Sequence, residues 1–266
     1  MSAPSTFLLG DDTRIVLGAL ACRTGTMTRL QPSASANGLL RRLPPEDFDR
    51  LAPDLRRVEV ELLQVLIAPG ETVETLYFPE SGYGSVVANG GEGGTGGVEI
   101  GLIGREGLIG AAPVLLDADR TPHQTLVQQA GTMLSLPASA LTEAVGRSET
   151  LRRFLLRYVH VHGLQVASTA YSNATYTIDV RLARWLLMCH DRAEGDEIRL
   201  THDFVALMLG GQRASATIAV QTLEGNGLIR AQRGRVTIRD RARLREMANG
   251  SYGSAEAEYA RLIGPS

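Results

Sequence analysis

The chain has 266 residues, 44% of them hydrophobic and 21% charged, with a formal net charge of −2, which fits a folded protein of two modest domains. This balance excludes a basic excess over the whole chain, so any nucleic-acid-binding surface must be local. Two cysteines, Cys22 and Cys189, are too few for a four-cysteine iron–sulfur or zinc site. No apolar run is long enough to cross a membrane and no secretory signal is evident, so we expect a cytoplasmic protein.

The first 35 residues predict a weakly structured extension, because an isolated apolar stretch is followed by serine, threonine and proline. A short helix is expected near Asn37, and a second one from Pro44. From residue 55 onward, turn signals recur at intervals of about 8–12 residues, which is typical of an antiparallel β-barrel or sandwich. The expected strands span residues 58–63, 65–67, 76–78, 84–88, 98–103, 124–128 and 132–137. The glycine-rich segment 89–97 has no lysine, which indicates a hairpin tip rather than a phosphate-binding loop.

Residues 148–172 predict one long helix with apolar side chains on two sides. One stripe has the spacing of a seam between two helices and comprises Leu151, Phe154, Tyr158 and Val161. The second stripe comprises Leu155, His162, Val166 and Thr169. A helix that is apolar on two sides must be covered on two sides, so we expect it to pack on the β-domain and on a second copy of the chain. The expected dimer interface contains Leu151, Phe154, Tyr158, Val161, His162 and Gln165. The alternative is a helix enclosed within a monomer.

Residues 201–238 hold the most informative pattern of the chain. Thr201 is suited to cap a helix that ends at the glycine pair 210–211. A second helix follows and stops near 225–227. Its buried stripe is expected to comprise Ala216, Ala219, Val220 and Leu223. Two short strands at 228–230 and 236–238 then flank a turn that carries Arg233 and Arg235. Helix, glycine turn, helix and basic hairpin predict a winged helix-turn-helix, a motif that places its second helix in the DNA major groove.

The second helix and the hairpin supply the residues that are expected to contact DNA. These are Thr201, Gln212, Arg213, Ala214, Ser215, Thr217, Ile218, Gln221, Arg233 and Arg235. We expect Arg213 to reach guanine or a phosphate, whereas the two hairpin arginines contact the backbone. Because the face that carries Ile218 is unusually apolar, we hypothesise that this side chain contacts a thymine methyl group. The alternatives are that Ile218 packs beneath the wing, or that the whole motif is an ordinary helical hairpin. A local basic patch is also expected from Arg213, Arg230, Arg233, Arg235, Arg239, Arg241, Arg243 and Arg245.

Together these segments resemble the Crp/Fnr family of bacterial transcription regulators over about residues 37–245. The resemblance rests on Ile67-Ala-Pro-Gly-Glu71, Tyr77-Phe-Pro79, Gly104-Arg-Glu-Gly-Leu-Ile-Gly110, Arg181-Leu-Ala-Arg-Trp-Leu-Leu187 and residues 200–229. It implies an N-terminal β-roll effector domain, a dimerisation helix and a C-terminal winged helix. It also implies that dimers bind two-fold symmetric promoter sites on double-stranded DNA and contact RNA polymerase.

The sequence departs from the cyclic-nucleotide-binding members of that family. There, a glutamate contacts the ribose and an arginine meets the cyclic phosphate; here Ala111 and Thr121 stand at these positions, and Arg120 is one place out of register. A buried phosphate without a paired cation is costly, so cyclic AMP is not expected to bind tightly. No cofactor is expected and the effector stays unknown. An effector pocket, if one is used, is expected around Gly107, Gly110, Ala111, Ala112, Arg120 and Thr121.

The expected fold class is therefore α+β, with an antiparallel β-roll, a long helix and a winged helix-turn-helix. The expected divisions are an extension at 1–35, the β-roll at 36–147, the dimerisation helix at 148–172, the DNA-binding domain at 173–246 and a C-terminal tail at 247–266. No hydrolase, zincin, Walker or dinucleotide-binding motif occurs, so an enzyme is not expected. The predicted function is that of a homodimeric, sequence-specific transcription regulator. The alternative is a sensory or interaction module whose β-roll binds a ligand or partner and whose winged helix contacts proteins.

Overall fold

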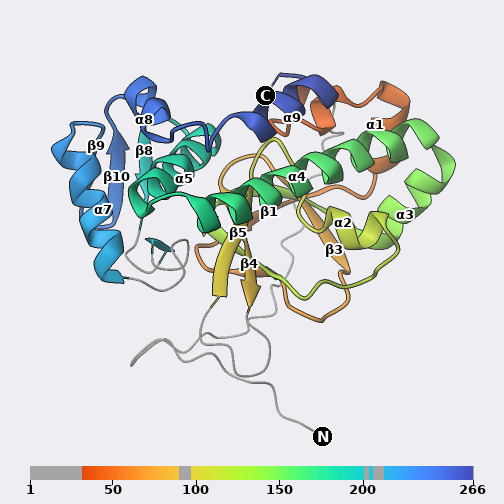
Figure 1. The fold of residues 1–266 in the computed structure, drawn as a ribbon. Coiled ribbons are helices and arrows are strands. Elements are labelled where there is room, and N and C mark those ends of the chain that lie inside the picture. Colours follow the sequence, from red (N-terminus) through yellow and green to blue (C-terminus); the bar gives the residue numbers. More distant parts are fainter. Residues whose placement is uncertain (1–31, 90–96, 201–203, 206–212, 266) are drawn as a thin grey trace, which may run out of the picture.

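The computed structural model describes residues 32–89, 97–200, 204–205 and 213–265. Within these ranges, a β-rich N-terminal half is joined by one long helix to a C-terminal half of helices and a small sheet (Figure 1). All paired strands are antiparallel, and the α+β class predicted from the sequence is confirmed.

The described N-terminal segment is anchored by one buried asparagine. Two single-turn 3₁₀ helices, Pro32–Ala34 and Leu40–Arg42, precede helix α1 (Pro45–Leu51). The Asn37 side-chain oxygen accepts from the backbone N–H groups of Leu39 (3.0 Å) and Leu40 (3.2 Å). Its amide donates to the carbonyl oxygens of Pro79 (3.0 Å) and Gly107 (2.9 Å). Most of the predicted extension at 1–35 lies outside the described residues.

Two antiparallel sheets form the β-roll. The first has the order β1 (Arg56–Val60), β7 (Gly131–Pro137), β3 (Thr75–Pro79). The second has the order β2 (Val65–Ile67), β6 (Gln124–Gln129), β4 (Tyr83–Asn89), β5 (Gly97–Ile103). The strands predicted from alternation are present, but β1 ends at Val60 rather than at residue 63. The reason is a turn in which Leu63 has φ +67° and leaves its side chain exposed.

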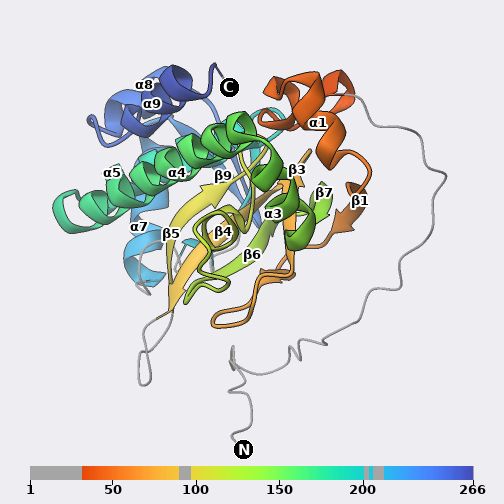
Figure 2. The same ribbon diagram turned by 90° about the vertical axis from the view of Figure 1, so that its right-hand side faces the viewer.

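Three helices follow the strands or lie between them: α2 (Ala111–Leu115), α3 (Ala138–Arg147) and α4 (Glu149–Thr175). The sequence analysis predicted α4 but neither α2 nor α3. Ser148 separates α3 from α4 because its backbone is extended and its hydroxyl accepts from the Leu151 N–H at 3.2 Å, a typical helix N-cap. In Figures 1 and 2, α4 crosses one side of the molecule from the β-roll to the C-terminal half.

The C-terminal half is built on α5 (Ile178–Arg192), whose apolar side chains form the centre of a large core cluster. A sheet of order β8 (Glu197–Arg199), β10 (Arg235–Ile238), β9 (Ile229–Gln232) lies beside α7 (Arg213–Gly225). Helix α8 (Arg241–Met247) follows the hairpin. The hairpin strands were predicted from the sequence, whereas β8 was not.

The C-terminal tail predicted for 247–266 is instead largely folded. Helix α9 (Ser254–Leu262) packs along α4 (Figure 2). Tyr259 and Ile263 are buried, and the Tyr259 hydroxyl donates to the carbonyl oxygen of Glu106 at 2.9 Å. The helix is short and its apolar residues are few, so its periodicity alone gave little signal. This segment is an integral part of the fold rather than a tail.

A buried carboxyl group joins the two halves. Glu99 on β5 is 4% exposed and accepts hydrogen bonds from the Trp185 indole nitrogen of α5 (2.6 Å) and from Ser85 Oγ of β4 (2.7 Å). Burial raises the pKa of Glu99 to about 7, although the hydrogen bonds from Ser85 and Trp185 oppose the rise. The folded protein thus retains a proton that the unfolded chain releases at lower pH.

Replacing Glu99 by glutamine is expected to stabilise the protein at alkaline pH. Because the folded-state pKa is raised, the Glu99 contribution to stability is fully present below about pH 4.5 and is lost as the pH rises to about 7. Glutamine keeps an oxygen for Trp185 and cannot ionise. We expect Glu99→Gln to exceed the parent by roughly 2–3 kcal/mol in the free energy of unfolding at pH 8, and to match it near pH 4.5. Urea unfolding at the two pH values measures this. Glu71→Gln in an exposed turn is the control, and an equal difference at both pH values would contradict the assignment.

Candidate nucleic-acid interface

Helix α7 has one buried face and one exposed face. Ala216, Ala219 and Leu223 are 2%, 1% and 0% exposed and belong to the core cluster that contains α5. Val220 is partly buried against the same cluster. The buried stripe predicted from helical spacing is confirmed. Its alanines have small side chains, which allow α7 to lie close to α5.

The exposed face of α7 combines polar and apolar side chains. Ile218 is 63% exposed, so it does not pack beneath the wing. Thr217 and Gln221 are exposed beside it, as is Ala214 near the start of the helix. The hydroxyl of Thr222 donates to the Ile218 carbonyl oxygen at 3.0 Å, within the helix itself. The face therefore presents a branched apolar side chain flanked by groups that can form hydrogen bonds.

The hairpin of β9 and β10 forms a basic projection next to α7. Its turn depends on Gly234, whose φ of +77° is costly for other residues. Arg233 is exposed at this turn. Arg235 is held more firmly, because its Nε donates to Gln232 Oε1 (2.7 Å) and its Nη1 lies 3.4 Å from Glu197 Oε2 of β8. Arg230 and Arg239 are also exposed, so the hairpin carries a local positive charge.

The predicted DNA-contacting residues are only partly covered by the structure. Thr201 and Gln212 lie outside the described residues, and Arg213 is the first residue of α7. Ser215 is half-buried, whereas Ala214, Thr217, Ile218, Gln221, Arg233 and Arg235 are exposed. The sequence analysis did not select Thr222 or Arg230 as contacts. Thr222 lies one helical turn after Ile218, and Arg230 follows the buried Ile229 along β9, so both lie on exposed faces.

The predicted basic patch of eight arginines does not form a single surface. Arg241 turns toward the end of α5, where it pairs with Asp191 Oδ1 at 2.5 Å and lies 2.8 Å from His190 Nδ1. Its guanidinium also lies 5.9 Å from the ring centre of Tyr252. The sequence placed Arg241 near the wing arginines, but helix α8 carries it to another side of the domain.

The structure places the residues of the predicted effector pocket in different surroundings. A Cβ atom on Gly107 would lie 2.3 Å from the Tyr158 hydroxyl, so α4 closes tightly over this position. Ala111 is buried in the core. Arg120 forms an exposed ion pair with Asp119 (2.9 Å) in a turn, which holds its guanidinium outside the roll. Apolar side chains fill the roll interior: Val60, Ile67, Val73, Val86, Ile103, Ile109, Val127 and Met133. Of the six predicted residues, Gly107 and Ala111 are thus packed inside the fold, whereas Arg120 is paired on its surface.

Most residues of the predicted dimer interface are buried within the chain itself. Leu151, Tyr158 and Val161 are 0%, 4% and 5% exposed and pack in the chain's own core with residues of α1, α3 and α9. Gln165 is buried too, and its side-chain oxygen accepts from the Leu102 N–H at 2.7 Å. Phe154 is partly buried against the same core. The α9 helix, which the sequence analysis did not foresee, covers part of this side.

Comparisons with known proteins agree with this architecture. Residues 180–247 match the Crp-like helix-turn-helix domain. A putative Crp/Fnr-family transcriptional regulator from Eubacterium rectale is similar in structure, with a TM-score of 0.63 and 17% identity, covering 81% of this chain and 99% of that chain. FixK2 from Bradyrhizobium japonicum has a TM-score of 0.62 and 15% identity, covering 73% of this chain and 96% of its own. A CRP-family regulator from Thermus thermophilus has a TM-score of 0.58 and 21% identity, covering 73% and 97%. Comparison with curated proteins gives no match.

The C-terminal domain is thus a Crp-like helix-turn-helix, and the chain has the fold of Crp/Fnr transcription regulators. This confirms the family resemblance predicted from the sequence. Among the described residues, no helix is both long and apolar enough to span a membrane. In the same parts of the chain, no group of three or more histidine, cysteine or acidic side chains is arranged to hold a metal ion.

Proposed function

We propose that the protein regulates transcription as a homodimer whose α7 helices enter the major groove of a two-fold symmetric DNA site. The observation that carries this proposal is the exposed face of α7 around Ile218, beside a hairpin that bears exposed arginines. The helix supplies side chains for base edges and the hairpin supplies cations for phosphates. Contact with RNA polymerase and a cytoplasmic location are part of the same proposal, because the target is promoter DNA.

Arg213 and Arg233 are expected to contribute to DNA binding in different ways. Arg213, at the start of α7, is proposed to contact a base, so Arg213→Ala should weaken the selected site by about 1–3 kcal/mol and relax the preference at one base pair. Arg233→Ala should weaken binding to all duplexes alike. It should also reduce the slope of log affinity against log salt concentration by about one, which corresponds to one lost phosphate contact. Selection from a random duplex library gives the site, and fluorescence anisotropy at several salt concentrations measures affinity.

Arg147→Ala on α3, in the other half of the molecule, is the control for both variants. It should bind the selected and scrambled duplexes as the parent does. If Arg213→Ala also retained the parent's affinity and preference, α7 would not be the reading helix. If binding by the parent were insensitive to salt, the interaction-module alternative would be favoured over DNA binding.

Ile218 is proposed to contact a thymine methyl group. Replacing the contacted thymine by uracil removes only that methyl group, so binding should weaken by roughly 1 kcal/mol, the value of one buried carbon. The same replacement should have no effect on an Ile218→Ala variant, because the partner surface is then missing. Anisotropy measurements on the four combinations of protein and DNA give the coupling free energy between the Ile218 side chain and the thymine methyl group. Equal losses in both proteins would show that another group reads the methyl.

The outer face of α4 is the surface proposed for dimerisation. Its outer stripe comprises Leu156, Val159, Gly163, Val166, Ala167, Ala170 and Ala174. These residues fall on one side of the helix, and all are exposed or only partly buried. A Cβ atom on Gly163 would meet nothing within 4 Å. Val159 also packs on the chain's own core, whereas Gly163 and the three alanines are exposed. Because these four side chains are small, the corresponding stripe of a second copy can lie close to them.

Charges in the outer stripe are expected to separate the dimer. The double variant Ala167→Glu/Ala170→Glu would bury carboxylates in the seam, whereas Ala242→Glu on α8 makes the same chemical change at an exposed site elsewhere. We expect the parent and Ala242→Glu to have dimeric mass at micromolar concentration, and the double variant to have monomeric mass with an unchanged circular dichroism spectrum. Light scattering measures this. A monomeric parent, or a dimeric double variant, would contradict the proposed interface.

A further inference from the structure

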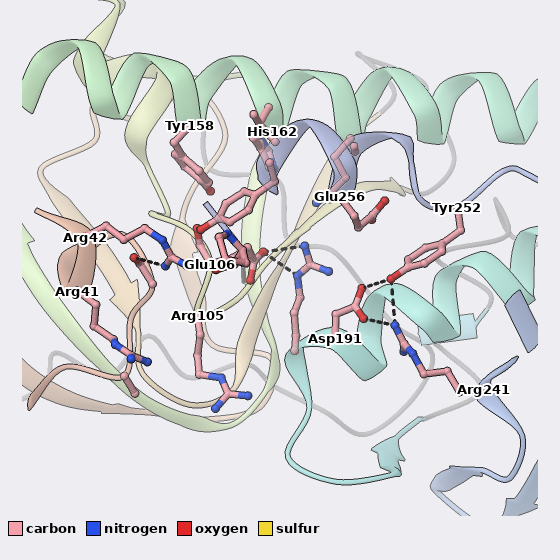
Figure 3. A pocket seen from close by; sticks show the side chains of 18 residues that line it. Arg41, Arg42, Arg105, Glu106, Tyr158, His162, Asp191, Arg241, Tyr252 and Glu256 are labelled. Atoms are coloured by element: carbon pink, nitrogen blue, oxygen red, sulfur yellow. Dashed lines mark hydrogen bonds and ion pairs between the residues drawn. The ribbon is translucent and has the colours of Figure 1, made fainter. Parts of the chain in front are cut away.

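A cleft of about 760 Å³ lies between the two halves of the molecule, apart from the filled interior of the β-roll (Figure 3). One wall comes from the N-terminal segment and from the loop after β5, which carry Arg41 and Arg105. Helix α4 contributes Tyr158 to the second wall. The end of α5 and the region of α8 and α9 contribute Arg192 and Arg241 to the third. The cleft has the volume of a site for a small molecule.

Positive charge predominates in this cleft. Five arginines line it, against three carboxylates. Two of the arginines have carboxylate partners, since Arg192 pairs with Glu106 (2.7 Å) and Arg241 with Asp191 (2.5 Å). The remaining three are Arg41, Arg42 and Arg105, all on the N-terminal side.

Within the described ranges, the arginines of the N-terminal wall have no carboxylate partner. Arg42 donates there to the backbone carbonyl oxygens of Gly38 (2.7 Å) and Pro265. For Arg41 and Arg105, the described part of the chain provides no hydrogen bond or ion pair to the guanidinium. Arg105 is nevertheless only partly exposed. A half-buried guanidinium without an anion is unfavourable, and an anionic ligand relieves the cost.

The α4 wall adds a second, independent feature. The Tyr158 side chain is 4% exposed, and its hydroxyl lies against the Gly107–Leu108 turn. Nε2 of His162, one turn further along α4, is buried without a hydrogen-bond partner in the described structure. Figure 3 shows Tyr158 descending from α4 toward the middle of the cleft, near the Glu106 loop. Tyr158 and His162 therefore give the α4 wall a mixed aromatic and polar character.

We propose that this cleft binds a small phosphorylated anion, with its phosphate groups on Arg41, Arg42 and Arg105 and its body against the α4 wall. Arginine suits this task because its planar guanidinium can donate two parallel hydrogen bonds to one phosphate. A stretch of DNA backbone is a poorer fit, since the cleft is walled by α4 and α9 on the sides away from the arginines.

Such a ligand would also regulate α7. Asp191 and Arg192 in the third wall belong to the last turn of α5, and α7 packs on α5. A ligand held by the N-terminal wall and by this turn binds best to one arrangement of the two halves and therefore favours it. This regulatory step rests on the proposed function, whereas ligand binding does not.

Pyrophosphate is the probe for the site. Calorimetry on the full-length protein, in the oligomeric state in which it is isolated, should show pyrophosphate binding with a sub-millimolar dissociation constant. Arg105→Gln should weaken this binding at least about tenfold, because one charge-assisted contact is lost. Arg157→Gln, an exposed arginine of α4 outside the cleft, should leave binding unchanged. Since Arg105 has no partner in the described structure, its variant should fold normally, which thermal unfolding checks. No binding at 10 mM pyrophosphate, or equal binding by both variants, would overturn the proposal.

Anisotropy with the selected duplex separates the remaining outcomes. Pyrophosphate should change the DNA affinity of the parent and of Arg157→Gln at least about threefold, and that of Arg105→Gln much less. If Arg105→Gln weakened DNA binding in the absence of pyrophosphate as much as Arg233→Ala does, the cleft would be a DNA contact and the ligand proposal would be wrong. Calorimetric binding by a protein that fails to bind any duplex would support the site and refute the proposed function.

Discussion

The hydrogen bond between the Glu99 carboxyl group and the Trp185 indole joins the β-roll to the C-terminal half of the molecule. Glu99 lies on a strand of the β-roll, and Trp185 lies in the middle of α5. Helix α5 in turn forms the core on which α7 and the small sheet pack. A second contact, the ion pair between Glu106 and Arg192, joins the last turn of α5 to the loop that follows β5. Two acidic residues seven positions apart thus orient the proposed reading helix relative to the β-roll.

The parts of the structure that the sequence predicted best are those in which periodicity has one interpretation. Strands of the roll alternate with one face on a filled interior, and α7 has a single buried stripe ending at Leu223. Once that stripe is known, the exposure of Ile218 follows from 100° of rotation per residue. The wing was equally clear, because glycine at 234 permits the turn between two short strands.

The errors arose where a pattern had two interpretations or where a contact joined distant segments. Helix α4 is apolar on two sides, and its sequence does not say which side meets the chain's own core. That question is decided by α9, which follows almost 80 residues after the end of α4. The cleft was missed for the same reason: Arg41, Arg105 and Arg241 are far apart in sequence, and no local spacing connects them. Arg120 was assigned by alignment to a motif, although its neighbour Asp119 already provides an exposed ion-pair partner.

The return of α9 to the β-roll has a mechanical consequence. After the C-terminal half, α9 contacts the N-terminal half again. The Tyr259 hydroxyl donates to Glu106, and Ile263 is buried. The α7 half is therefore joined to the roll through α4, through α9 and through the contacts of α5 with Glu99 and Glu106. A body held at one point can rotate in any direction about it, whereas contacts at three or more points that are not in line leave no free rotation. A change in the position of α7 relative to the roll therefore requires at least one of these contacts to break.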